Sequence, residues 1–239
     1  ILAVSDYVKD HLYQTVPQLQ NTEIVKVTNG IRGWTYSKEE RQSLREQMRD
    51  RYHVGEEETI YLFAGRVSPE KGVLEMTRAF RAVLPRLRHK SRLFIVGSAS
   101  SGSDKESYYY RAVKKEAAQS PESIILTGYI NHEDVAKYHV MADAQIVPSI
   151  MDDPAPLTVL EGMSMGNFLL LSKAGGIPEY SANYSNKIFF ERGDSFEKNI
   201  RDAFLSYDQD KAPHRYENSA NHFGEERYYR ELAEAVDVS

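Results

Sequence analysis

The chain has 239 residues, of which 41% are hydrophobic and 27% charged, a length and composition that exclude a largely disordered polypeptide. It has no cysteine, which excludes disulfides, thiolate metal sites and a cysteine nucleophile. The net charge of -5 at pH 7 argues against a general polyanion binder, so nucleic acid is not an expected partner.

Residues 1–30 have the pattern of the end of an α/β unit. Two short apolar segments, residues 1–5 and 24–30, flank a helical pattern over 7–13. Asn29 and Gly30 favour a turn. We therefore expect these residues to be the end of an amino-terminal domain and its interdomain connection, with the rest of that domain lying upstream of this chain.

The polar stretch 37–58 comes next, with five Arg or Lys residues between positions 38 and 51. It predicts an exposed helix that leads into the first buried strand. Its charges are most simply a solvated face.

Six short apolar runs rich in β-branched residues follow, with little polar alternation, as in parallel strands buried on both faces. They lie at residues 59–64, 92–96, 123–127, 144–148, 167–172 and 187–190. Helical patterns separate or follow them, at residues 72–87, 105–119, 133–142, 157–165 and 196–207. This alternation predicts an α/β fold with a doubly wound, Rossmann-like parallel sheet over 31–207, and a ligand crevice at the carboxyl ends of its strands.

The remaining residues, 208–239, begin with a polar stretch and end in a helical pattern over 226–236. We expect this last helix to pack back toward the amino-terminal domain. No apolar run reaches the roughly 18 residues that a membrane span needs. Segment 78–92 has six Arg or Lys residues and no acid, which fits a solvated helix face better than the alternative, a weak peripheral contact with an anionic membrane.

Two cations lie in the loop GRVSPEKG (65–72), between a strand end and a helix start. Arg66 can offer a planar fork of donors to phosphate oxygens, and Lys71 a mobile point charge. The start of the helix adds main-chain N–H groups. The loop therefore suits a diphosphate, although Gly65 and Gly72 could serve only the turn, with Arg66 paired to a nearby acid.

Two carboxylates lie in a later loop and helix, IVPSIMDDPAPLTVLEGMSMG (146–166). Asp153 precedes the helix, and Glu161 is about one turn inside it. Both could accept hydrogen bonds from the hydroxyls of a sugar or ribose, while cations and amides hold a phosphate. The alternative is that they only favour the helix dipole.

These two segments, with FIVG (94–97), LTGYI (126–130) and KAGGIPE (173–179) in this order, resemble the carboxyl-terminal half of the family 4 retaining glycosyltransferases, which have the GT-B fold. The resemblance covers residues 24–194. VSDYVKDHL (4–12) and VTNGI (27–31) are similar to that family's interdomain connection, and the last helix to the one that crosses back onto the amino-terminal domain.

The resemblance implies roles for the charged residues. Arg66 and Lys71 would hold the diphosphate of a nucleoside-diphosphate sugar, with UDP the favoured nucleotide. Glu161 would hold the ribose hydroxyls, and Asp153 takes the place of the glutamate that contacts the transferred sugar. No metal and no further cofactor are implied. The acceptor would be a glycan, a lipid or a protein.

The resemblance also implies contacts of the donor with other residues at the strand ends and the helix start, namely Gly65, Gly97, Tyr129, Ile130, Ala155, Leu157 and Thr158. The glycines could instead be simple turn residues. Gly175, Gly176 and Glu179 would lie near the donor sugar, unless Glu179 only favours a helix start.

One departure from the family affects the loop after Asp153. The family usually has Glu followed by Gly-Phe-Gly, where this chain has Asp153, Pro154, Ala155 and Pro156. Proline has no N–H, so each proline removes a donor that a glycine could present to the ligand.

None of the seven histidines shows metal-ligand spacing with carboxylates, so we expect His53, His89, His132 and His139 to be surface or packing residues.

The leading hypothesis is therefore the donor-binding domain of a retaining, metal-independent glycosyltransferase, inactive without its amino-terminal domain. The expected location is the cytoplasm, including the inner face of the membrane. A non-catalytic GT-B partner subunit is the alternative, favoured by the sequence Asp-Pro-Ala-Pro at 153–156. A nucleotide-sugar epimerase or hydrolase fits the order of the motifs less well.

Overall fold

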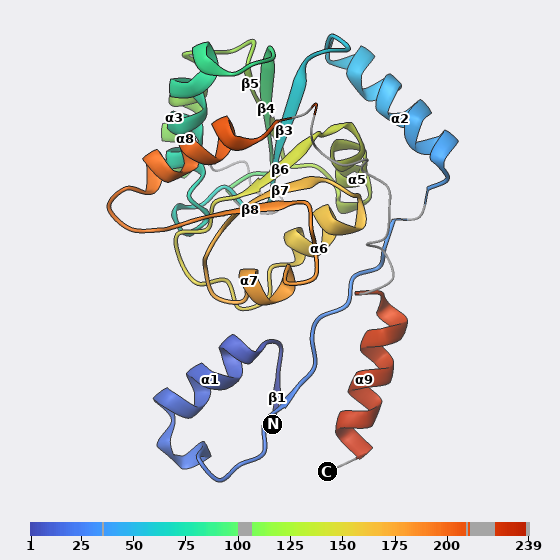
Figure 1. Ribbon diagram of the computed structural model, residues 1–239, viewed down its shortest axis with the longest axis vertical. Coiled ribbons are helices and arrows are strands. Elements are labelled where there is room, and N and C mark those ends of the chain that lie inside the picture. The colour runs from blue at the N-terminus through green and yellow to red at the C-terminus, as the bar shows by residue number, and fades with distance from the viewer. Residues whose placement is uncertain (35, 100–106, 209, 211–222, 238–239) are drawn as a thin grey trace.

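The computed structural model describes residues 1–34, 36–99, 107–208, 210 and 223–237 of the chain. Its main body is a parallel sheet of six strands in the order β5-β4-β3-β6-β7-β8, with helices on both faces (Figure 1). The strands are β3 (Thr59–Ala64), β4 (Ser91–Val96), β5 (Ile124–Gly128), β6 (Ala144–Val147), β7 (Phe168–Ser172) and β8 (Lys187–Phe190). Each lies within one residue of its predicted bounds, and the predicted doubly wound α/β sheet is confirmed.

The helices pack on the two faces of this sheet because successive side chains of a strand point to opposite sides. Tyr61 and Phe63 pack with α3 (Val73–Val83), α4 (Tyr108–Ala117) and α8 (Phe196–Ser206). On the other face, Ile60 and Leu62 pack with α2 (Lys38–Arg51) and α5 (His132–Met141). On that same face, α6 (Leu157–Ser164) covers β7.

Two helices differ from their expected bounds. α3 ends at Val83 and passes into a short 3-10 helix, Leu84–Arg86, because Pro85 cannot continue the α-helical hydrogen bonds. α4 begins at Tyr108, and residues 105–106 of its predicted range lie outside the described residues.

Two arginines of α2 bind buried polar groups and are not simply exposed to solvent. Arg45 donates to Asp143, whose side chain is fully buried, over 2.7 Å from Nη2 to Oδ1. Arg49 donates to the main-chain oxygen of Glu58 at 2.9 Å. The expectation of a solvated face is therefore wrong for Arg45 and Arg49, because both satisfy polar atoms that burial would otherwise leave without partners.

The basic segment 78–92 is also largely paired with carboxylates. The pairs are Arg78 with Glu116 and Glu197, Arg81 with Glu116, Arg88 with Asp208 and Asp210, and Lys90 and Arg92 with Glu58. This pairing favours a face laced with ion pairs over a cationic patch for a membrane. In the described part of the chain, no helix combines the length and apolarity of a membrane span.

The ion pair between Glu58 and Arg92 should make the stability of the folded chain depend on pH. Burial alone would raise the pKa of Glu58, but hydrogen bonds from Arg92 and Lys90 outweigh it and lower the pKa from 4.5 to about 2. The unfolded chain therefore binds this proton more readily, and about 3 kcal/mol of stability, present above pH 4.5, is lost as the pH falls toward 2.

Urea unfolding of the Glu58→Gln variant checks this prediction. We expect the variant to be less stable than the unmodified chain at pH 7 and to lose about 3 kcal/mol less between pH 4.5 and pH 2. Parallel profiles of the two proteins over this range would contradict the assignment of the pH dependence to Glu58.

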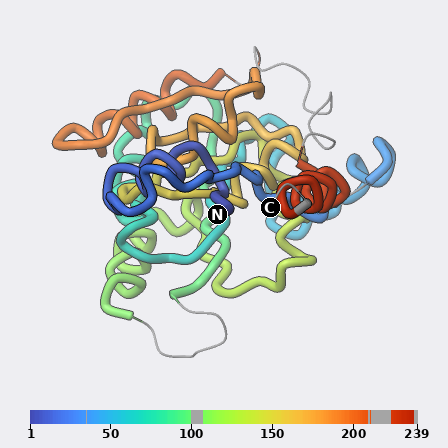
Figure 2. Tube along the Cα trace, turned by 90° about the horizontal axis from the view of Figure 1, so that it is seen from below, coloured from blue at the N-terminus to red at the C-terminus, as the bar shows by residue number. Residues whose placement is uncertain are grey.

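The first and last elements lie together at one end of the main body, below the sheet in Figure 1 and nearest the viewer in Figure 2. They comprise the parallel pair β1 (Leu2–Ala3) and β2 (Val25–Lys26), α1 (Asp6–Thr15) and α9 (Glu225–Asp237). Arg227 of α9 donates to the main-chain oxygens of Thr28 at 2.8 Å and Asn29 at 2.9 Å. The helix expected near the carboxyl end is thus present, tied to the predicted interdomain connection. Most of the polar stretch before it, residues 211–222, lies outside the described residues.

Candidate functional site

Two adjoining pockets lie at the carboxyl ends of the strands, where the strand order reverses between β3 and β6. Open α/β sheets bind ligands at this switch point, because the loops after the two central strands diverge there. The first pocket, of about 240 Å³, lies between the end of β3 and the start of α6, and the second, of about 340 Å³, extends toward β4 and β5. They share Ala64, Gly65 and Thr158.

The structure brings together the four charged residues with expected roles and the other residues expected to contact the donor at the strand ends and the helix start. Those lining the first pocket are Gly65, Lys71, Asp153, Ala155, Leu157 and Thr158. Those lining the second are Gly65, Arg66, Gly97, Tyr129, Ile130, Thr158 and Glu161. These two adjoining pockets, together called the crevice below, thus hold both cations and both carboxylates.

Glycine at two neighbouring strand ends allows the main chain to line this crevice closely. Gly65 has φ +150° and Gly97 has φ +145°, which side chains rarely adopt. A Cβ atom on Gly97 would lie 1.9 Å from the main-chain oxygen of Gly65. The two glycines therefore permit the strand ends to approach, and leave the pocket wall free of side chains there.

Lys71 and Asp153 face each other in the first pocket. Their Nζ and Oδ2 atoms are 2.5 Å apart, and the side chains are 29% and 12% exposed. In the absence of an anionic ligand, a short ion pair of this kind neutralises the charge of the carboxylate. The same lysine can exchange Asp153 for a phosphate oxygen of a ligand.

The prolines after Asp153 leave this loop with few donors. Pro154 and Pro156 have no N–H, and the N–H of Ala155 donates to Asp153 itself, with 3.4 Å from N to Oδ1. The loop is anchored from behind by Gly176, whose N–H donates to the main-chain oxygen of Asp153 at 2.7 Å. Residues 154–156 therefore offer no free main-chain N–H to a ligand in the first pocket.

Arg66 lies at the open side of the second pocket. It is 60% exposed and pairs with Glu70, with 2.6 Å from Nη2 to Oε1. An exposed pair contributes at most about 1 kcal/mol, so the guanidinium can turn toward an anion in the pocket at little cost.

Glu161 lies in the second pocket with a histidine near each carboxylate oxygen. His132 Nε2 is 3.1 Å from Oε1, and His139 Nε2 is 3.9 Å from Oε2. His132 is 67% exposed and itself lines the pocket, whereas His139 is wholly buried. His132 is thus a surface residue, as expected, but it also lines the pocket, which was not predicted from the sequence. Its signal in the sequence is its place at the start of α5, shortly after the end of β5 at Gly128.

Ser149 is a second residue that sequence reasoning missed. It follows β6, lines the first pocket and is 1% exposed. Among the described residues its hydroxyl has no hydrogen-bond partner, although buried hydroxyls normally have one. A ligand in the first pocket could supply that partner.

Glu179 does not belong to this crevice. Its carboxylate accepts hydrogen bonds from the main-chain N–H groups of Asp6 and Tyr7, and from Lys26 Nζ at 2.9 Å. It therefore caps the start of α1, and the expectation that it lies near a donor sugar is wrong.

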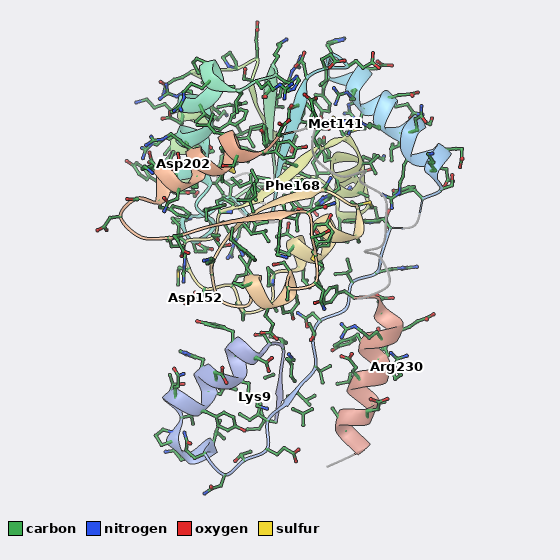
Figure 3. The ribbon with its side chains drawn as sticks, viewed as in Figure 1. Lys9, Met141, Asp152, Phe168, Asp202 and Arg230 are labelled. Atoms are coloured by element: carbon green, nitrogen blue, oxygen red, sulfur yellow. The ribbon has the colours of Figure 1, made fainter. Side chains whose placement is uncertain are left out.

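Its neighbours in the sequence, by contrast, support the loop of the first pocket. Gly175 donates from its main-chain N to Asp152 Oδ1 at 2.8 Å, and Asp152 also pairs with Arg192. Asp152 lies at the edge of the main body that faces α1 (Figure 3). A hydrogen bond to Asp152 raises the pKa of the Tyr7 hydroxyl of α1, so the same carboxylate connects that helix to the loop.

Within the described ranges, no three His, Asp or Glu side chains are grouped as metal ligands are. Metal independence remains a prediction.

Fold and site together define a doubly wound α/β ligand-binding domain whose crevice suits an anionic ligand with hydroxyl groups. The family model for glycosyl transferases group 1 matches residues 12–223, and the chain belongs to this family.

A curated relative is the lipopolysaccharide 1,2-N-acetylglucosaminetransferase of Salmonella typhimurium, 29% identical over 181 residues that cover 75% of this chain and 45% of the relative. The chain thus spans about half the length of the curated relatives it matches.

Solved GT-B glycosyltransferases share the fold. Anabaena HepE, crystallised with UDP and glucose, superposes with a TM-score of 0.80 at 17% identity, covering 100% of this chain and 62% of HepE. A chain of the GtfA/B complex superposes with a TM-score of 0.70 at 16% identity, covering 99% of this chain and 44% of its own. The expected fold, the carboxyl-terminal half of a GT-B protein, is confirmed.

Proposed function

We propose that this chain is the donor-binding part of a retaining, metal-independent glycosyltransferase that transfers a sugar from a nucleoside-diphosphate sugar to an acceptor hydroxyl. One observation carries the proposal: Arg66, Lys71 and Glu161 line two adjoining pockets at the switch point of the sheet. Membership of the glycosyl transferases group 1 family supports the reaction class. UDP is the proposed nucleotide, supported by the UDP bound to HepE, which has the same fold.

The two pockets divide the donor between them. The nucleoside lies in the second pocket, where the carboxylate of Glu161 accepts hydrogen bonds from the ribose hydroxyls. The diphosphate lies at the junction of the pockets, within reach of Arg66 on one side and Lys71 on the other. The sugar then enters the first pocket, which includes Asp153 and the buried hydroxyl of Ser149.

Transfer breaks the bond between the anomeric carbon and the diphosphate, and negative charge develops on the leaving phosphate. Arg66 and Lys71 stabilise this charge, and donors of this kind contribute roughly 3 kcal/mol each to lowering a barrier. When Lys71 turns to the phosphate, Asp153 is released to accept a hydrogen bond from a sugar hydroxyl. The acceptor, a glycan, a lipid or a protein, would be bound largely by an amino-terminal domain across the crevice.

Calorimetry of this chain with UDP, GDP and ADP tests the proposal, and we expect UDP to bind. Arg66→Ala should weaken binding about tenfold, since a hydrogen bond to a charged group contributes about 1.5 to 3 kcal/mol and part of the phosphate contact remains with Lys71. Arg88→Ala is the matched control, because Arg88 is 65% exposed and pairs with Asp208 away from the crevice. Absence of binding by all three nucleotides would overturn the proposal.

A non-catalytic partner subunit is the second candidate. The prolines at 154 and 156 and the neutralised Asp153 favour it, and a chain of the GtfA/B complex has the same fold. Assays of the full-length protein with UDP-sugars separate the two functions: transfer or slow donor hydrolysis indicates the enzyme. UDP binding with neither reaction, in the presence of acceptor extracts, indicates the partner.

A further inference from the structure

His139 is a buried titratable residue that the proposed reaction does not use. It lies on α5, directly behind Glu161, and is 0% exposed. Its Nε2 atom has no hydrogen-bond partner among the described residues and lies 3.9 Å from Glu161 Oε2. A buried polar atom without a partner costs free energy, so its position beside a carboxylate of the crevice calls for an explanation.

The neighbouring amide fixes which nitrogen of His139 carries the proton. Asn167 Nδ2 donates to the main-chain oxygens of His139 at 2.8 Å and Ala142 at 3.2 Å, which sets the orientation of the amide. Its Oδ1 atom, an acceptor only, lies 2.9 Å from His139 Nδ1. The neutral imidazole therefore has its hydrogen on Nδ1 and a lone pair on Nε2.

This lone pair faces a second acceptor, Glu161 Oε2. Two acceptors cannot bond without a hydrogen between them, which accounts for a separation of 3.9 Å instead of a hydrogen-bonded one. A proton on Nε2 would convert the contact into a charge-assisted hydrogen bond of about 2.8 Å. Protonation of His139 would therefore draw the carboxylate toward Nε2 from the position that it has in the structure.

The groups around His139 favour the neutral state at neutral pH. Burial lowers the pKa of His139, and His132 on α5 lowers it further. The negative charge of Glu161 on α6 and the hydrogen bond with Asn167 raise this pKa, but burial outweighs them. Arg45 of α2 is held by Asp143 and by main-chain oxygens at the end of α5, and Arg41 of α2 donates to the main-chain oxygen of Met165.

We propose that His139 is a positioning residue for Glu161. The neutral imidazole leaves the carboxylate facing the second pocket, and a proton on Nε2 draws it into an ion pair, away from ligand hydroxyls. This inference rests on the proposed function, which assigns Glu161 to the ribose. Donor affinity should then fall in acid, and by reciprocity a bound donor should make His139 harder to protonate.

Calorimetry with UDP between pH 7.5 and 5.5 measures the effect in the unmodified chain, in His139→Gln and in His11→Gln, an exposed histidine of α1. Protonation of the diphosphate affects all three proteins equally. We expect the unmodified chain and His11→Gln to lose more affinity over this range than His139→Gln does, by less than about tenfold because the pKa of His139 lies below its usual value. Circular dichroism checks that the variant keeps its fold.

A second measurement needs no substitution of the buried histidine. Imidazole ¹⁵N spectra of the unmodified chain should show the Nδ1–H form of His139. Its protonation midpoint should fall when UDP is added, and also with uridine, which brings the ribose without the charge of the diphosphate. An unchanged or raised midpoint with both ligands, at concentrations where they bind, would overturn this inference alone. Absence of nucleotide binding at every pH would overturn the proposed function and this inference with it.

Discussion

Replacement of Lys71 by methionine is expected to weaken UDP binding about a hundredfold and to reduce transfer by the full-length protein at least as much. Lys71 is the cation of the first pocket, and methionine keeps most of its length without the charge. A charge-assisted hydrogen bond to phosphate accounts for about 3 kcal/mol, close to a hundredfold. Calorimetry with UDP measures the binding, and a donor-turnover assay measures the transfer.

Two further variants separate binding from folding. Lys71→Met leaves Asp153, which is 12% exposed, without its partner, so the double variant with Asp153→Asn should recover stability but not UDP affinity. Lys198→Met is the matched control, because Lys198 pairs with Asp202 on α8, away from the crevice. Equal UDP affinity in Lys71→Met and Lys198→Met would contradict the role of Lys71.

Gly72→Ala is expected to lower the free energy of unfolding by more than about 3 kcal/mol. Gly72 has φ +64°, and a Cβ atom there would lie 2.1 Å from the main-chain oxygen of Pro148. The new Cβ atom would clash with the main chain and not with a flexible side chain, so the clash can be relieved only by separating the start of α3 from the end of β6. Urea unfolding followed by circular dichroism measures the loss.

Two other glycines provide a graded comparison. Gly128 has φ +73° with nothing within 4 Å of its Cβ position, so Gly128→Ala should cost only the backbone strain, about 1 to 2 kcal/mol. Gly33 has neither feature, and Gly33→Ala should cost almost nothing. A loss for Gly72→Ala no larger than that for Gly128→Ala would show that the loops are not packed as described.

The sheet could be predicted closely from the sequence, because strands buried on both faces are continuous apolar runs. The run at residues 59–64 is fully buried in β3, as its composition indicated. For α2, the sequence predicted a helix but not the environment of its arginines. Arg45 and Arg49 are held by acceptors at residues 143 and 58, and no local sequence pattern shows these contacts.

The crevice followed from topology, because the carboxyl ends of parallel strands meet at one edge of the sheet. Arg66 and Glu161 therefore line one pocket, although they are 95 residues apart in the sequence. Pairings of individual side chains could not be predicted in this way. Glu179 finds its partners 172 and 173 residues away at the start of α1, and the pairing of Lys71 with Asp153 spans 82 residues.

A crystal structure of this chain with UDP bound is the most direct test of the crevice as a donor site. We expect the ribose hydroxyls on Glu161, the base beside Gly97 and Tyr129, and the diphosphate in contact with both Arg66 and Lys71. UDP bound outside the two pockets, or bound within them with neither cation on a phosphate oxygen, would contradict the proposed function.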